Sequence, residues 1–272
     1  MEMKITFVGG GNMANALAGG LLKRGFAAAQ LRAIEPVSAS REKMERALGV
    51  RCFASAVPEA LACDVLVLAV KPQQMQEALA PIAGRLAHQL VISIAAGLRL
   101  ADLSRWLGGH RRLVRTMPNT PALVGAGITG LYADPSVDAA GRAQAESVLA
   151  AVGGTLWIAD EAMMDAVTAV SGSGPAYVFY FLEALAKAAV ELGFAQRDAR
   201  RLAIETFAGG VALARASDEP LAALRERVTS KGGTTEAALR VFDAEGVGRA
   251  IRAAVLAACE RGRELGASLG RD

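Results

Sequence analysis

The chain has 272 residues, of which 53% are hydrophobic and 5% aromatic, so it can bury a substantial core in one large domain or two of ordinary size. Its 30 basic and 27 acidic residues leave a net charge of +3, which is too small and too dispersed to indicate a polyanion, and few aromatic residues are available to stack on bases. We therefore expect no nucleic-acid partner, and we expect no membrane partner because no stretch reaches about 18 uncharged apolar residues.

A short apolar run at residues 5–8 passes directly into Gly-Gly-Gly-Asn-Met-Ala and then into a helical pattern. This order of strand, G-x-G-x-x-A and helix is typical of a dinucleotide-binding βαβ unit. Gly9 allows the tight turn, Gly11 leaves room for a pyrophosphate, and Ala14 lets the helix pack close to the sheet. Because the first N–H groups of a helix are free to bind phosphate, the sequence predicts a nucleotide redox cofactor.

Apolar runs and helical patterns alternate from there to about residue 160. Several runs lack the period-2 alternation of a half-exposed strand, and such runs are typical of parallel sheets covered on both faces. We therefore predict a doubly wound α/β domain of the Rossmann type over residues 1–160. Its predicted strands are residues 5–8, 31–34, 65–70, 90–94, 113–115, 127–131 and 155–158, and its predicted helices include residues 15–22, 40–48 and 75–86.

Long helices replace the strand signals after residue 160. Residues 175–192 carry an apolar stripe at helical spacing, followed by Gly193, which suits a C-terminal glycine stop. A second stripe covers residues 246–265. The first of these helices is apolar on most sides, so we predict an all-helical domain over residues 161–272 whose surface a partner subunit helps to cover.

Glu35 is predicted to end the second strand, where a carboxylate can accept hydrogen bonds from the adenosine ribose. Taken alone, Glu35 favours NADH, because its charge repels the 2′-phosphate of NADPH. Ser38, Ser40 and Arg41 follow and could hold that phosphate, so these residues leave the choice of cofactor open. The alternative is a structural glycine turn with a glutamate at the surface.

Two other predicted strands end in residues suited to the same ligand, because ligands of doubly wound sheets bind at the carboxyl ends of the strands. Val70 and Lys71 end one of them, and the lysine is placed either to meet a ribose or phosphate or to lie in solvent. Ala96 follows the next, where small residues either let a nicotinamide lie against the backbone or serve packing.

Two polar loops come next along the chain. Asn119 lies between two prolines, and its amide either faces a ligand or closes a rigid loop with its own hydrogen bonds. Ser171 belongs to Ser-Gly-Ser-Gly-Pro before the long helix, where its hydroxyl either caps the helix or faces the cleft.

Residues 229–236 read Thr-Ser-Lys-Gly-Gly-Thr-Thr-Glu, a glycine pair that leads into a helix start. The N–H groups of such a turn bind anions, so a substrate carboxylate is one expected ligand, and a flexible linker with a helix cap is the alternative. His88 and His110 lie in no motif, so neither is an evident base for oxidising an alcohol. A protonated imine is already an electrophile, so its reduction needs correct positioning more than a proton relay. The absence of an evident base therefore favours imine reduction over alcohol oxidation.

The three cysteines, Cys52, Cys63 and Cys259, are odd in number and lack C-x-x-C spacing. We therefore expect neither a disulfide framework nor a metal site, and we predict small buried thiols in a reducing cytoplasm. The first residues also lack the basic and then apolar pattern of a secretory leader, which favours the same cytoplasmic location.

Together these segments resemble the pyrroline-5-carboxylate reductases. The resemblance implies a Rossmann domain followed by a helical dimerisation domain, with helices interleaved between subunits and dimers that often assemble further. It also implies reduction of L-1-pyrroline-5-carboxylate to L-proline, the last step of proline biosynthesis, with NADPH as cofactor or NADH in its place. The matching stretches cover residues 7–17, 67–72, 93–97, 117–122, 170–177 and 228–236, in the order found in the family.

The resemblance assigns the cofactor to residues of the first domain. In that assignment the pyrophosphate lies on the glycine loop, Glu35 lies beside the adenosine ribose with Ser38 and Ser40 nearby, and the strand ends line the ribose and nicotinamide. The full cofactor set is Gly9, Gly11, Asn12, Met13, Glu35, Ser38, Ser40, Val70, Lys71 and Ala96.

The same resemblance assigns the substrate to the loop of the second domain, completed by the partner chain. Thr235 is the catalytic candidate, because its hydroxyl would hydrogen-bond the ring nitrogen. The carboxylate would be bound by the residues just before it. The substrate-binding set is Ser230, Gly232, Gly233 and Thr234, with Asn119 and Ser171 as further candidates.

The chain departs from the family pattern at two positions. Many relatives have proline where this chain has Lys231, and many have asparagine at the position of Ala56. Two other hypotheses remain, a 3-hydroxyacid dehydrogenase or other imine reductase and a nucleotide-sensing protein without catalysis. Tyr177 stands where the 3-hydroxyacid dehydrogenases have their lysine, which counts against the first of these.

Overall fold

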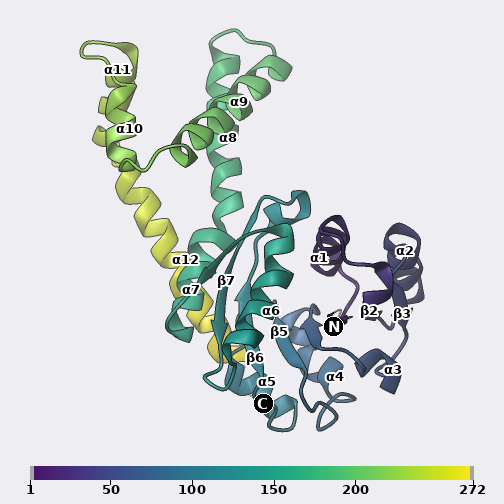
Figure 1. Ribbon diagram of the computed structural model, residues 1–272. Helices are drawn as coiled ribbons and strands as arrows, with labels where there is room; N and C mark the ends of the chain where they lie inside the picture. The colour runs from purple at the N-terminus through teal and green to yellow at the C-terminus, as the bar shows by residue number, and fades with distance from the viewer. Residues whose placement is uncertain (1–2, 270–272) are drawn as a thin grey trace. The chain divides into compact units, whose positions relative to one another are not determined.

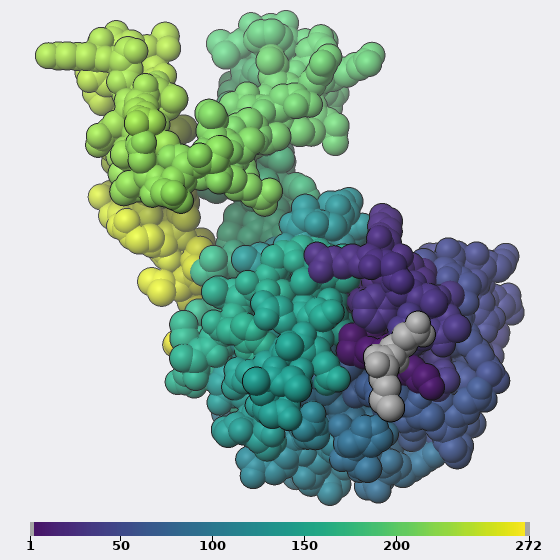
Figure 2. Space-filling view, in the orientation of Figure 1, coloured from purple at the N-terminus to yellow at the C-terminus, as the bar shows by residue number. Residues whose placement is uncertain are grey.

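The computed structural model describes residues 3–269 and divides the chain into two compact units (Figure 1). Unit 1 comprises Met1–Ser173 and Ala258–Asp272, and unit 2 comprises Gly174–Ala257. The last helix, α12 (Val247–Leu269), therefore begins in unit 2 and ends in unit 1. In Figure 2 the purple-to-teal residues of unit 1 form one closely filled body.

Unit 1 continues past the domain boundary that the sequence analysis places after residue 160. Helix α7 (Met164–Val167) packs against strands of the unit 1 sheet, and Glu161 pairs with Arg115 of that sheet at 3.1 Å. These contacts hold residues 161–173 to the sheet, and the end of α12 joins the same unit. The boundary between the two predicted domains, after residue 160, stays a prediction.

Among the described residues, the strands of unit 1 form one eight-stranded sheet in the order β3-β2-β1-β4-β5-β6-β7-β8. Neighbouring strands are parallel except for β6 and β7, which are antiparallel. The edge strand β3 was not predicted, because its three residues include a charged side chain and form no apolar run. The strands are β1 (Ile5–Val8), β2 (Leu31–Ile34), β3 (Arg51–Phe53), β4 (Val65–Leu68), β5 (Leu90–Ser93), β6 (Leu113–Met117), β7 (Gly127–Ala133) and β8 (Gly153–Trp157).

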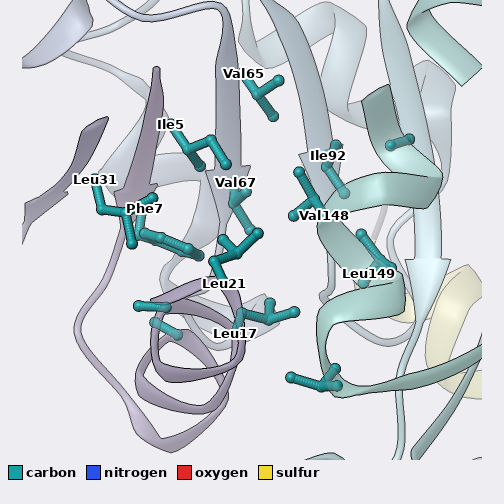
Figure 3. Close-up of a cluster of buried hydrophobic side chains, with 14 of the residues drawn as sticks. Ile5, Phe7, Leu17, Leu21, Leu31, Val65, Val67, Ile92, Val148 and Leu149 are labelled. Atoms are coloured by element: carbon teal, nitrogen blue, oxygen red, sulfur yellow. The ribbon is translucent and has the colours of Figure 1, made fainter. Parts of the chain in front are cut away.

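Alternate residues of the central strands enter two hydrophobic layers, one on each face of the sheet. Ile5 and Phe7 of β1 pack with Leu17 and Val148 in the first layer (Figure 3), whereas Val8 packs into the second. Burial on both faces explains the uninterrupted apolar strands of the sequence. The first layer contains residues of α1 (Asn12–Lys23), α2 (Ser38–Leu48) and α6 (Ala139–Leu149), and the second contains residues of α3 (Pro58–Leu61), α4 (Met75–Leu79) and α5 (Leu100–Trp106).

Helix α4 is shorter than the helix predicted over residues 75–86. It ends at Leu79, and that prediction was wrong beyond this residue. Pro81 gives the reason, because proline lacks an amide hydrogen and its ring clashes with the carbonyl four residues earlier in a helix. Short turns complete unit 1: η1 (Ala28–Gln30), η2 (Pro72–Gln74), η3 (Thr120–Val124), η4 (Ala150–Val152), η5 (Glu161–Met163) and η6 (Thr168–Gly172).

Unit 2 is helical, and its helices α8 and α9 pack against each other. Helix α8 stops before Gly193, whose φ of +99° confirms the predicted glycine stop. Phe179 and Tyr180 of α8 are 66% and 72% exposed in the single chain, as expected for a helix that a partner covers. None of the described helices has the length and apolar character needed to cross a membrane. The helices are α8 (Gly174–Glu191), α9 (Gln196–Arg215), α10 (Leu221–Arg227), α11 (Thr234–Ala244) and the first part of α12.

Candidate functional site

The loops after β1, β4 and β5 lie side by side at one edge of the sheet. The three strands are parallel neighbours in register, so their carboxyl ends meet at this edge. The order of strands reverses between β1 and β4, and the crevice at such a reversal is where doubly wound folds bind their ligands. The structure thus brings Gly9, Val70 and Ala96 to neighbouring loops at one edge.

Gly9 occupies a backbone conformation that requires glycine. Its φ is +100°, and its N–H donates to the carbonyl oxygen of Ile34 at 2.8 Å. A Cβ at this position would lie 2.9 Å from both the carbonyl oxygen of Ala69 and Cγ1 of Val70. The tight turn predicted for Gly9 is present, and it presses the glycine loop against the loop after β4.

Gly11 is exposed, and a Cβ built on it would meet nothing within 4 Å. It is the N-terminal cap of α1, so the exposed Asn12 and the half-buried Met13 lie in the first helical turn, where N–H groups have no partner inside the helix. The backbone here is open to an anion from outside. This is the arrangement that a pyrophosphate requires.

Asn15 braces the glycine loop, a role that the sequence analysis missed. Its Nδ2 donates to the carbonyl oxygens of Gly10 at 2.7 Å and Gly11 at 2.9 Å. The signal for this role was an amide side chain in the first helical turn, where short polar side chains bond to nearby backbone groups.

Glu35 also braces the glycine loop. Its Oε2 accepts from the Gly10 N–H at 2.8 Å, and its Oε1 accepts from the Val37 N–H at 2.9 Å. Nη1 of Arg41 donates to the carbonyl oxygens of Glu35 and Pro36 at 2.8 and 2.7 Å. Each carboxylate oxygen retains lone pairs, so Glu35 can accept further hydrogen bonds from a ribose.

The remaining predicted cofactor residues are placed as follows. Ser38 is the first residue of α2 and is exposed, and Ser40 lies two residues further on in the same turn. Lys71 is exposed directly before η2, and Ala96 is exposed in the loop after β5. All of them lie in loops or helix starts that follow the carboxyl ends of β2, β4 and β5.

Asn119 closes the loop between β6 and β7. Its Oδ1 accepts from the Ile128 N–H at 3.0 Å, and its Nδ2 donates to the carbonyl oxygen of Ser171 at 3.2 Å. The Ser171 hydroxyl donates to the carbonyl oxygen of Val167 at 3.0 Å, within its own turn. Asn119 was expected either to face a ligand or to close a rigid loop, and these hydrogen bonds are those of a closed loop. They also join Asn119 to Ser171.

The predicted substrate loop lies in unit 2, between α10 and α11. Gly232 has a φ of +73°, and its N–H donates to Oε2 of Glu236 at 2.7 Å. The Gly233 N–H donates to the carbonyl oxygen of Ser230 at 3.0 Å. Thr234 and the half-buried Thr235 begin α11, where first-turn N–H groups have no acceptor inside the helix. The turn therefore already holds one carboxylate, that of Glu236.

The three cysteines are free thiols. Cys52 is half-buried, and burial raises its pKa to about 11. Burial also raises the pKa of Cys63, so neither thiol is an activated nucleophile. His110 lies away from the described loops, its Nε2 is 2.9 Å from the carbonyl oxygen of Gln89, and burial lowers its pKa.

Two families match separate parts of the chain. Residues 161–265 match the family described as pyrroline-5-carboxylate reductase dimerisation. Residues 4–97 match the family described as NADP oxidoreductase coenzyme F420-dependent. The first covers the helical part of the chain, and the second covers the glycine loop and the strand ends.

Curated relatives align with the chain from end to end. A protein of Pseudomonas aeruginosa named pyrroline-5-carboxylate reductase is 46% identical over 271 residues, which cover 98% of each chain. A protein of the same name from Escherichia coli is 37% identical and covers 98% of this chain and 100% of its own.

Solved structures agree with this comparison. A pyrroline-5-carboxylate reductase from Coxiella burnetii matches with a TM-score of 0.92 at 37% identity, covering 97% of this chain and 99% of its own. A pyrroline carboxylate reductase from Plasmodium falciparum, solved with NADP bound, matches with a TM-score of 0.85 at 31% identity over 98% and 99% of the two chains.

Proposed function

The chain belongs to the pyrroline-5-carboxylate reductase family, and on that premise we propose how its residues divide the work between cofactor and substrate. The protein is an NAD(P)H-dependent oxidoreductase that reduces L-1-pyrroline-5-carboxylate to L-proline, the last step of proline biosynthesis. It acts as a homo-oligomer built on its dimerisation domain.

The glycine loop fits the pyrophosphate of NADPH, with NADH as the alternative. Open space over Gly11 and the free first-turn amides of α1 support this assignment, as does the bracing of the loop by Asn15 and Glu35. A loop that is held in place before the ligand arrives loses little entropy on binding. When bound, the reduced nicotinamide supplies a hydride for carbon C5 of the imine.

We assign the adenosine ribose to Glu35, Ser38 and Ser40. The Glu35 carboxylate is held by two backbone N–H groups, so its charge is partly compensated before a 2′-phosphate approaches. The neighbouring serine hydroxyls and the guanidinium of Arg41 offer donors to that phosphate. This environment accounts for NADPH binding next to a glutamate.

We assign the ribose and nicotinamide to the loops after β4 and β5. Val70 packs directly against the position of Gly9, which brings the loop after β4 to the glycine loop. Lys71 and Ala96 are exposed at the same edge of the sheet. Ala96 presents only a methyl group, so a flat ring can lie against the backbone there.

The substrate carboxylate is assigned to the turn formed by Ser230, Gly232, Gly233 and Thr234. The observation that carries this assignment is the carboxylate of Glu236, which the Gly232 N–H already binds at 2.7 Å. The turn thus binds a carboxylate, and in this proposal the substrate carboxylate takes the place of that of Glu236 beside the free first-turn N–H groups of α11. The Thr235 hydroxyl, on the first turn of the same helix, is assigned to the ring nitrogen, so one rigid turn orients both ends of the small ring.

In this proposal Asn119 and Ser171 hold the backbone of neighbouring segments in place and do not bind the substrate themselves. The hydrogen bond between them, and that from Ile128 to Asn119, hold the loop after β6 to η6 within unit 1. We propose a positioning role for both, with direct substrate contact left to the turn at residues 230–235. We also propose a cytoplasmic location, which suits three free thiols.

A steady-state assay tests the function. Purified protein is supplied with pyrroline-5-carboxylate and either NADPH or NADH, and loss of absorbance of the reduced cofactor is followed. We expect steady oxidation that depends on the imine, with proline as the product. Cofactor binding without turnover would instead indicate a nucleotide sensor, and turnover with 3-hydroxyacids and NADP⁺ alone would indicate a dehydrogenase.

A further inference from the structure

The end of helix α12 packs closely against the loop that carries Ala96. Gly266 is buried, and a Cβ built on it would lie 3.0 Å from the carbonyl oxygen of Gly97. Gly97 itself has a φ of +82°, and a Cβ there would lie 3.1 Å from Cδ1 of Leu269. Both contacts are within unit 1. Helix backbone and loop backbone therefore touch without any side chain between them.

A half-buried ion pair holds the same loop at its other end. The Leu100 N–H donates to Oε1 of Glu161 at 2.8 Å, and Nη1 of Arg115 lies 3.1 Å from the same oxygen. The Arg115 side chain is only 4% exposed, and its Nη2 lies 3.9 Å from Oδ1 of Asp165. The end of α12 therefore contacts this loop at Gly97, and Glu161 holds it at Leu100.

We propose that Gly266 and Leu269 are positioning residues for the nicotinamide half of the cofactor. This inference rests on the proposed assignment of Ala96 to that half. Ala96 precedes Gly97 directly, so a displacement of a few tenths of an ångström at Gly97 moves the Ala96 backbone with it. Overfilled packing shifts neighbouring backbone in this way. The adenosine half lies on the loops after β1 and β2, and those loops make no part of this contact.

The proposal also gives α12 a second role. The helix is uninterrupted from Val247 to Leu269, and its first half belongs to the dimerisation unit. The same helix thus contributes residues to both units, and its end belongs to the unit that carries the cofactor loop.

Two variants and one matched control test the proposal. Gly266→Val adds bulk against the Gly97 carbonyl, and Leu269→Ala removes the contact without adding bulk, so the test survives if the first variant folds poorly. Gly262→Ala is the control on the same helix, because its new Cβ would lie at an ordinary 3.7 Å from Cβ of Asp165. Each protein is titrated with NADPH and with adenosine 2′,5′-bisphosphate, which lacks the nicotinamide half.

We expect Gly266→Val to raise the Kd and the KM for NADPH about tenfold. The Kd for adenosine 2′,5′-bisphosphate should stay within about twofold, and Leu269→Ala should show the same selectivity with a smaller change. Gly262→Ala should match the parent protein for both ligands. Unchanged NADPH binding, or equal weakening of both ligands, would overturn the proposal. Failure of the parent protein to reduce pyrroline-5-carboxylate would be a separate result, directed at the function.

Discussion

The chemical groups that the proposed sites offer to ligands are largely backbone N–H groups, and polar side chains around them hydrogen-bond to the same stretches of backbone. Asn15 and Glu35 hydrogen-bond to the glycine loop, and Glu236 hydrogen-bonds to the Gly232 N–H. Only substitution by proline removes a backbone donor, and proline also restricts the backbone conformation. The residues whose replacement is informative are therefore the braces and the single hydroxyl assigned to the reacting ring.

Replacement of Thr235 by alanine tests that hydroxyl. We expect kcat/KM for pyrroline-5-carboxylate to fall about tenfold to a hundredfold, since one hydrogen bond in a dry site is worth about 1–3 kcal/mol. The thermal unfolding midpoint should hold, because Thr235 is half-buried and the α11 cap is Gly233. Thr235→Ser retains a hydroxyl and should recover much of the rate. If Thr235→Ala turns over like the parent, Thr235 has no part in the mechanism.

Glu35→Gln separates the two roles of the Glu35 carboxylate. Loss of the charge should raise the ratio of kcat/KM for NADPH over NADH about fivefold, because an exposed charge pair a few ångströms apart is worth about 1 kcal/mol. Glutamine has one acceptor oxygen, so one of the two backbone N–H groups loses its partner and stability falls by about 1–3 kcal/mol. Kinetics with both cofactors and urea unfolding measure these effects.

The control for this experiment is Glu42→Gln, which removes the same charge from an exposed position of α2. It should leave both the cofactor ratio and the stability near those of the parent. An unchanged ratio in Glu35→Gln would mean that the Glu35 charge does not influence the 2′-phosphate.

At the scale of elements, two adjacent glycines of α1 have opposite surroundings. A Cβ on Gly20 would lie 2.5 Å from the carbonyl oxygen of Ala151 and 2.9 Å from Cγ1 of Val152. A Cβ on Gly19 would lie 3.7 Å from Cδ2 of Leu48, an ordinary contact. Helix α1 therefore approaches η4 backbone to backbone at Gly20, and of these two glycines it is Gly20 whose missing side chain the packing requires.

Gly20→Ala and Gly19→Ala form a matched pair. We expect Gly20→Ala to lower the free energy of unfolding by about 1–3 kcal/mol through overpacking, even though alanine is the better helix former. Gly19→Ala should raise it by as much as about 1 kcal/mol, from helix propensity. Urea unfolding at one fixed protein concentration compares them, because the stability of an oligomer depends on concentration. Equal effects of the two substitutions would contradict this description of α1.

The elements that the sequence predicts best are those whose signal is local. Strands β1 and β2 have the predicted bounds, because three of the four residues of each strand are apolar and buried. The error in α4 came from reading apolar spacing past Pro81, where backbone chemistry overrides the pattern. Strand β3 is stabilised by pairing with β2 at the sheet edge, which no local pattern of three residues can indicate.

The site divides in the same way. Gly9 was predicted because a tight turn after a strand needs a positive φ, and Gly9 has one. The hydrogen bonds of Asn15 and Asn119 depend on which carbonyl and N–H groups the fold brings within 3.2 Å of their amides. No sequence pattern predicts those contacts. The glycine pair in residues 229–236 predicted an anion-binding turn, and the resemblance to a family added the roles of its residues. The hydrogen bond from the Gly232 N–H to the Glu236 carboxylate emerged only from the structure.

For the whole molecule, the main physical fact is the apolar surface that unit 2 leaves exposed in a single chain. Phe179 and Tyr180 on α8 are examples, and Val241 and Phe242 on α11 are 58% and 54% exposed. Exposed apolar surface on this scale marks an interface. The match to a dimerisation family over residues 161–265 identifies its occupant as a second copy of the chain.

Phe179→Asp should convert the oligomer into monomers. A charge buried without a partner is strongly unfavourable, and the aspartate is well solvated only in the separated chains.

Light scattering after size-exclusion chromatography measures the mass, and Phe179→Leu is the control that keeps an apolar side chain. We expect the monomer to lose reduction of pyrroline-5-carboxylate, because the family resemblance implies that the partner chain completes the substrate site. It should still bind adenosine 2′,5′-bisphosphate, because the glycine loop and its braces belong to unit 1. A monomer with full reductase activity would show that one chain completes the site, and loss of both activities would show that unit 1 depends on the dimer for its fold.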